Sequence, residues 1–195
     1  MDAFELLVEA HRPAMKLVLA KLVEILRAHD VRYVIGGANA LSLYVRPRMT
    51  IDIDILVDAT QRNEVEEALS SCFEVVSSGS SHSKFNAADV EIDVRYATTS
   101  GERFALDESR DAIILGTKVR APSPEALVWL YLLSKREQNF VDGAGLMRSQ
   151  PALDFSRLHS LVEQYDSALI GTLHEMQTSA RRPIISYEES RARRS

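Results

Sequence analysis

The sequence predicts an α/β protein of the α+β kind, with a mixed β-sheet head flanked by helices and a helical C-terminal lobe. Short β-branched runs alternate with helical patterns as far as residue 121, which is typical of a head built on a mixed sheet. From residue 122 to about 179 the apolar spacing is helical only, in several pieces. The predicted parts are a helical N-terminal segment, a core, a helical lobe and a basic tail, at residues 1–29, 30–121, 122–180 and 181–195.

The head carries the strand patterns. Apolar residues at helical spacing predict a helix over 3–28, which Pro13 divides or restarts. Residues 60–71 should form a helix with Thr60 as its N-cap, and the serine-rich 77–83 should form a loop. A shorter helix is expected at 38–45, and strands are expected at 31–35, 51–57, 73–77 and 90–97.

A hairpin and helices should follow. Residues 107–111 are expected to be a solvated turn, and 112–121 a hairpin that turns at Gly116-Thr117. Ser123, Pro124 and Glu125 are typical of the start of a helix. The helical pattern that follows is expected to break near 142–145 and at Pro151.

Composition excludes several classes of protein. Of the 195 residues, 46% are hydrophobic, which is enough for a folded core. The net charge of −5, and −8 for residues 1–180, argues weakly against a broad nucleic-acid footprint. A single cysteine suits a reducing compartment. With no signal-peptide pattern and no membrane-spanning run, we expect a cytoplasmic protein.

The stretch TIDIDILVD places Asp52 and Asp54 inside an apolar run that should be a buried strand. Alternate residues of a strand share a face, so the two acids are expected about 7 Å apart and on the same side. Asp93, in the alternating VEIDVRY, joins them if its strand pairs beside theirs. Carboxylates without histidine or thiol favour Mg²⁺ or Mn²⁺.

Gly36-Gly37 lies between a predicted strand and a predicted helix. Glycine permits close approach of a ligand, and a helix N-terminus offers free N–H groups to phosphate. Each feature also has a plainer explanation: an ion pair or cap for Asp-x-Asp, a simple turn for Gly-Gly, and a salt bridge to Arg95 or Arg48 for Asp93. The combination is more specific, because unpaired buried charges are costly. It indicates phosphoryl or nucleotidyl transfer.

The stretch VIGGANALSLYVRPRMTIDIDILVD resembles the signature of the DNA-polymerase-beta-like nucleotidyltransferase superfamily. It is most similar to the minimal bacterial branch, which includes toxin-type enzymes and lincosamide- and aminoglycoside-modifying enzymes. The resemblance spans about residues 30–145. It implies that Asp52, Asp54 and Asp93 are catalytic and bind the metal, with Asp93 as base toward the acceptor hydroxyl. It further implies that Gly36 and Gly37 hold a nucleoside triphosphate. Arg48 and Thr50 match the Arg-x-Thr-x-Asp form of this branch.

Two departures from the family pattern concern the spacer and the first C-terminal helix. The 14 residues between Gly37 and Asp52 are slightly more than usual. Tyr131 stands where toxin-like relatives carry a lysine, and Gln138-Asn139 replaces Lys-Asp. Lys135, four residues after Tyr131, is expected on roughly the same helix face and is the predicted substitute.

The resulting hypothesis is a Mg²⁺-dependent nucleotidyltransferase. Its acceptor would be an RNA or tRNA end, a protein or a small molecule, and its protein partner could be a cognate antitoxin. The rival hypothesis is a non-catalytic nucleotide-binding or antitoxin-like protein that retains the fold. Arg48 is expected to serve the cleft, whereas the tail arginines, His82 and the 107–111 turn are expected to be solvated. Of Trp129 and Tyr131, a core position is favoured over stacking on a base.

Overall fold

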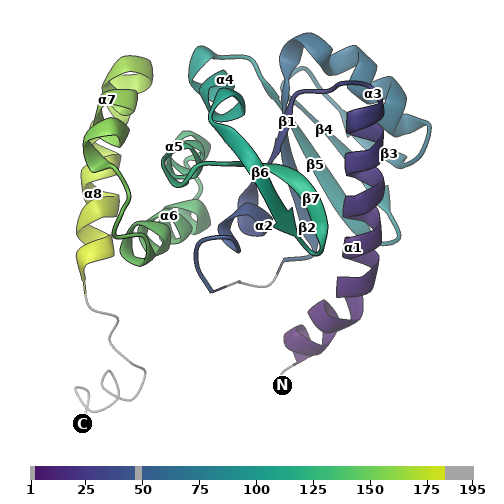
Figure 1. The fold of residues 1–195 in the computed structure, drawn as a ribbon, viewed down its shortest axis with the longest axis horizontal. Coiled ribbons are helices and arrows are strands. Elements are labelled where there is room, and N and C mark those ends of the chain that lie inside the picture. Colours follow the sequence, from purple (N-terminus) through teal and green to yellow (C-terminus); the bar gives the residue numbers. More distant parts are fainter. Residues whose placement is uncertain (1–2, 47–49, 183–195) are drawn as a thin grey trace.

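A computed structural model of the chain describes the backbone of residues 3–46 and 50–182, and the side chains of residues 12–46 and 50–182 (Figure 1). The expected mixed α+β architecture is confirmed. A five-stranded sheet lies beside a long N-terminal helix, and a group of helices from the second half of the chain lies on the other side.

The sheet is mixed and has the strand order β1-β2-β5-β4-β3. β2 and β5 at its centre are parallel, and the other neighbours are antiparallel. The strands are β1 (Tyr33–Ile35), β2 (Asp52–Asp58), β3 (Glu74–Ser78), β4 (His82–Ala87) and β5 (Val90–Ala97). The parallel pair is possible because α3 (Arg62–Ser70), β3 and β4 return the chain to the start of β5.

One face of the sheet is covered by α1 (Ala3–Ala28) and α3 (Arg62–Ser70) (Figure 1). Alternate residues of β2 and β5 supply this core, including Ile53, Ile55, Ile92 and Val94, all of them buried. Because successive strand residues point to opposite faces, this packing directs Asp52, Asp54 and Asp93 to the other face.

The other face meets α4 (Ser100–Asp107) and α5 (Pro124–Ser134), which pack over Val34, Leu56 and Ala97. The short α2 (Gly37–Leu41) follows β1 directly, and a hairpin of β6 (Ser109–Ile114) and β7 (Thr117–Pro122) lies beside β1. The lobe is completed by α6 (Glu137–Ser149), α7 (Phe155–Asp166) and α8 (Ile170–Arg181), with the short 3-10 helices η1 (Ala59–Gln61) and η2 (Ser167–Leu169) as connectors. None of the helices in the described ranges has the length and apolar composition that a membrane span requires.

Several local expectations were wrong. Pro13 lies inside a continuous α1. Thr60 is not the N-cap of α3: it lies within η1, whose N-cap Asp58 accepts the Thr60 amide, and the N-cap of α3 is Gln61. The hairpin turns at Leu115-Gly116, both with positive φ, and its first strand takes up residues 109–111, which were expected to be a turn.

Two elements were not anticipated at all. The expected loop at 77–83 ends in β4, and α4 forms at residues 100–107. The expected break at 142–145 is also absent, since α6 runs through it. Gly143 packs closely against α8, because a Cβ on it would lie 2.5 Å from the sulfur of Met176 and would require that side chain to move. The break at Pro151 is confirmed.

α4 is fixed to the sheet through Glu102. This residue forms a capping box with Thr99, and its carboxylate also accepts two hydrogen bonds from Arg95 of β5, at 2.9 and 2.6 Å. Burial alone raises the pKa of Glu102, but the Thr99 amide and the Arg95 guanidinium outweigh it and hold the pKa below its usual value. The ionised carboxylate therefore stabilises the fold.

We predict that Glu102→Gln lowers the free energy of unfolding by about 2 kcal/mol at neutral pH, because an amide cannot accept all the donors around it. The folded-state pKa is depressed, so this stabilisation is complete above the ordinary pKa of about 4.3 and is lost as pH falls through the folded-state pKa. Urea unfolding of both proteins from neutral to acid pH measures the difference, which should shrink in the acid range.

The matched control is Glu163→Gln, because Glu163 is an exposed helix residue whose carboxylate lies near His159. Its effect should stay below about 0.5 kcal/mol. Equal stability of the two variants at neutral pH would show that Glu102 has no structural role of the kind described.

Candidate active site

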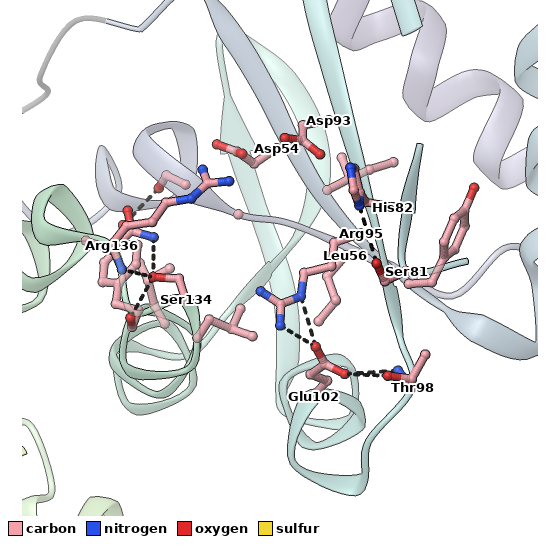
Figure 2. Close-up of a pocket in the computed structure, with 18 of the residues that line it drawn as sticks. Asp54, Leu56, Ser81, His82, Asp93, Arg95, Thr98, Glu102, Ser134 and Arg136 are labelled. Atoms are coloured by element: carbon pink, nitrogen blue, oxygen red, sulfur yellow. Dashed lines mark hydrogen bonds and ion pairs between the residues drawn. The ribbon is translucent and has the colours of Figure 1, made fainter. Parts of the chain in front are cut away.

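A pocket of about 540 Å³ lies on the sheet face opposite α1, between the central strands, α4 and the end of α5 (Figure 2). Its wall contains Gly36 and Gly37, two carboxylates of the central strands, and side chains of β4 and the helical lobe. It therefore joins the head to the first helix of the lobe.

Asp54 and Asp93 form the acidic centre of this pocket. They are register partners in the parallel pair of β2 and β5, so their side chains leave the same face of neighbouring strands, which are about 4.8 Å apart. Figure 2 shows the two carboxylates side by side among the residues that line the pocket. The chemistry of this pair, hard oxygen donors only, fits a Mg²⁺ or Mn²⁺ ion.

Asp52 lies one pleat away on the same face, opposite Glu91 of β5. Its carboxylate accepts a hydrogen bond from the Thr50 hydroxyl, and its backbone carbonyl accepts the Asn39 side-chain amide at 2.8 Å. It is not part of the pocket wall. In the described residues no three His, Cys, Asp or Glu side chains are grouped so as to hold a metal ion. The structure thus brings Asp54 and Asp93 together, with Asp52 adjacent.

The Gly36-Gly37 turn fits directly against Asp54. The Gly36 amide donates to the Asp54 carbonyl at 2.8 Å, which extends the pairing of β1 with β2. Gly37 has φ +53°, and a Cβ on it would lie 1.8 Å from a carboxylate oxygen of Asp54. Its carbonyl accepts the Tyr131 hydroxyl of α5 at 3.0 Å. Only glycine fits at position 37, and the turn is tied to the lobe.

Lys135 does not lie on the same helix face as Tyr131, where the helical spacing predicted it. α5 ends at Ser134, and Lys135 adopts a left-handed conformation with φ 54° that redirects the chain. Its side chain lines a different cavity, whereas the next residue, Arg136, reaches into the acidic pocket (Figure 2). Arg48 lies outside the described residues.

Two further cations line the pocket. Lys84 of β4 lies opposite Asp93 in the strand register, and its hydrogen bond to Glu91 raises the pKa of its amine. Arg95 is held by Glu102 at the other end of the pocket (Figure 2). Sequence reasoning missed Lys84 because no strand was expected at β4: residues 77–83 were expected to be a loop, and residues 84–89 were assigned to no element.

The structure also places Trp129, Tyr131 and His82, for which the sequence left two roles open. Trp129 and Tyr131 are both buried, so neither is free to stack on a base. His82 lies on β4 rather than in a loop; it lines the pocket and is hydrogen-bonded to Ser81 (Figure 2).

Comparison with known proteins gives one family match. A family model described as nucleotidyl transferase AbiEii toxin, type IV TA system, matches residues 21–130. This range contains both glycines and all three aspartates of the site. No curated protein matches the chain.

Several solved structures share the fold. A solution structure of the antibiotic-resistance factor ANT(2″)-Ia superposes with a TM-score of 0.59 at 17% identity, over 85% of this chain and 98% of that one. A crystal structure of ANT(2″)-Ia with adenylyl-2″-tobramycin gives 0.58 at 18% identity, over 80% and 98%. An antigenic nucleotidyltransferase-like protein from Paracoccidioides brasiliensis gives 0.50 at 19% identity, over 85% and 91%. At these identities the likeness concerns the fold alone.

We predict that Gly37→Ala lowers the free energy of unfolding by about 2 kcal/mol or more, because the new methyl group meets the Asp54 carboxylate and the left-handed backbone is strained. Gly36→Ala is the matched control, since its Cβ would make only an ordinary 3.7 Å contact; it should cost less than about 1 kcal/mol. Denaturant unfolding measures both, and equal losses would contradict the close contact at Gly37.

Proposed function

Because the chain belongs to the AbiEii family of nucleotidyl transferase toxins and is a nucleotidyltransferase, we propose that it moves a nucleoside monophosphate from a nucleoside triphosphate to an acceptor hydroxyl. The observation that carries this proposal is the Asp54–Asp93 pair, held in register within a pocket that also contains Gly36 and Gly37. An acidic pair beside a glycine turn suits a metal-bound triphosphate.

We propose that the divalent ion, Mg²⁺ or Mn²⁺, would be held by Asp54 and Asp93. The resemblance implies Asp52 as a third carboxylate, and Asp52 lies one pleat away on the same sheet face, outside the pocket wall. When bound, such an ion neutralises phosphate charge and lowers the pKa of an attacking hydroxyl. Thr50 holds the Asp52 carboxylate by a hydrogen bond, so its role is to orient that side chain.

In the proposed reaction the acceptor oxygen forms a bond to the α-phosphorus, and the bond from that phosphorus to the pyrophosphate oxygen breaks. Asp93 takes the proton of the acceptor hydroxyl. Gly36 and Gly37 line the pocket on the Asp54 side of the pair, and we propose that they hold the β- and γ-phosphates there. We also propose that Arg48 contributes a charge-assisted contact to the triphosphate.

The charge of the pocket bears on the acceptor. Lys84, Arg95 and Arg136 all line it, and Arg95 is paired with Glu102, which lines it too. A polycationic acceptor would therefore meet the positive charges of Lys84 and Arg136 once the acidic pair is neutralised by metal. This favours a neutral or anionic acceptor, such as an RNA or tRNA end, over an aminoglycoside. The family description supports a toxin role with a cognate antitoxin as protein partner.

We predict that Asp54→Asn lowers nucleotide transfer at least about 100-fold, because it removes one charge from the pair that holds the metal. The assay uses purified protein, Mg²⁺ and each α-labelled nucleoside triphosphate, with total tRNA, a protein extract and small hydroxyl compounds as acceptors. Asp111→Asn is the matched control: it removes an aspartate from the β6–β7 hairpin, outside the pocket wall, and should retain activity.

Loss of transfer in both variants would point to a general charge effect and count against the assigned centre. If the wild type transfers no label and calorimetry with Mg²⁺ detects no binding of a triphosphate, the proposed reaction is wrong. A non-catalytic binding protein would then be the better account.

A further inference from the structure

Lys84 occupies a row with the two acidic residues of the site. Asp54 of β2 is the register partner of Asp93 of β5, and Asp93 is the register partner of Lys84 of β4. The three side chains therefore leave the same sheet face from three adjacent strands. Gly36 and Gly37 lie at the Asp54 end of this row, and Lys84 lies at the Asp93 end.

The present partners of Lys84 can be exchanged at little cost. Its ammonium is 2.5 Å from Glu91 and 3.9 Å from Asp93. The side chains of Lys84 and Glu91 are 32% and 44% exposed, and ion pairs between groups this exposed contribute little to stability. Glu91 is not part of the pocket wall, whereas Lys84 is, so a ligand in the pocket competes directly for the ammonium.

The other two cations of the pocket are placed differently. Arg95 is committed to the buried Glu102 by two hydrogen bonds. Arg136 enters from the helical lobe, on the opposite side of the pocket from β4 (Figure 2). Lys84 is thus the cation that the sheet itself places next to Asp93.

Resting on the proposed function, we propose that Lys84 binds the α-phosphate of the nucleotide, giving up Glu91 for a non-bridging phosphate oxygen. The order of the row supports this choice. The β- and γ-phosphates belong at the glycine end, and the reacting phosphorus belongs between Asp54 and Asp93, so the next group along the row is nearest to the α-phosphate. A lysine serves there as a point charge on a flexible stem.

The test is calorimetric binding in Mg²⁺ of the four nucleoside triphosphates, and separately of pyrophosphate, which lacks the α-phosphate. Lys84→Gln should weaken binding of the preferred triphosphate about 10- to 100-fold and leave pyrophosphate within about threefold of wild type. Lys84→Arg should restore most of the loss. Glu91→Gln should bind the triphosphate at least as tightly as wild type, because it frees the ammonium.

Lys118→Gln is the matched control, since it removes a lysine from an exposed ion pair with Asp111 outside the pocket wall. It should change neither affinity. If Lys84→Gln weakens both ligands equally, weakens neither, or impairs only transfer to an acceptor, Lys84 does not bind the α-phosphate and this inference is overturned. If the wild type itself binds no triphosphate, the proposed function is wrong as well. Binding by the wild type therefore distinguishes failure of the Lys84 inference from failure of the proposed function.

Discussion

Two carboxylates of like charge, Asp54 and Asp93, are held on neighbouring parallel strands, and their repulsion is the constraint around which the head is arranged. The apolar residues that alternate with them bury against α1 and α3, so the strands cannot turn over to separate the charges without exposing that core. Lys84 supplies positive charge from β4, beside Asp93. The pair offers hard oxygen donors only, which suits a divalent cation such as Mg²⁺.

The helical lobe contributes to this centre by setting the glycine turn. Tyr131 is buried among lobe residues, yet its hydroxyl reaches the Gly37 carbonyl, and Gly37 in turn touches the Asp54 carboxylate. Packing inside the lobe and the position of an acidic side chain in the head are therefore connected through one residue. The left-handed turn at Lys135 has the related effect of sending Arg136 into the pocket.

Much of the head was predictable because its signals are periodic. Alternation in TIDIDILVD and VEIDVRY placed the aspartates on one face, and the Ser123-Pro124 start of α5 was read correctly. Strand pairing is a non-local property, so the sequence did not reveal that β2 and β5 are parallel neighbours. β4 was missed because its residues His82, Lys84 and Asn86, which share one face of the strand, are polar like those of a loop. Helical spacing placed Lys135 on the same helix face as Tyr131, but α5 ends at Ser134. The spacing contains no information on where a helix ends. The division of the chain at residues 121 and 122 stays a prediction.

The central claim is that Asp54 and Asp93 jointly bind the metal that carries the triphosphate. It is tested most directly by anomalous diffraction from crystals grown with Mn²⁺ and a triphosphate that cannot be cleaved at the α-phosphorus. The account predicts a manganese peak within bonding distance of carboxylate oxygens of both aspartates, with the phosphates extending toward Gly36 and Gly37. A manganese peak that contacts neither aspartate, or a nucleotide seated in another cavity, would contradict it.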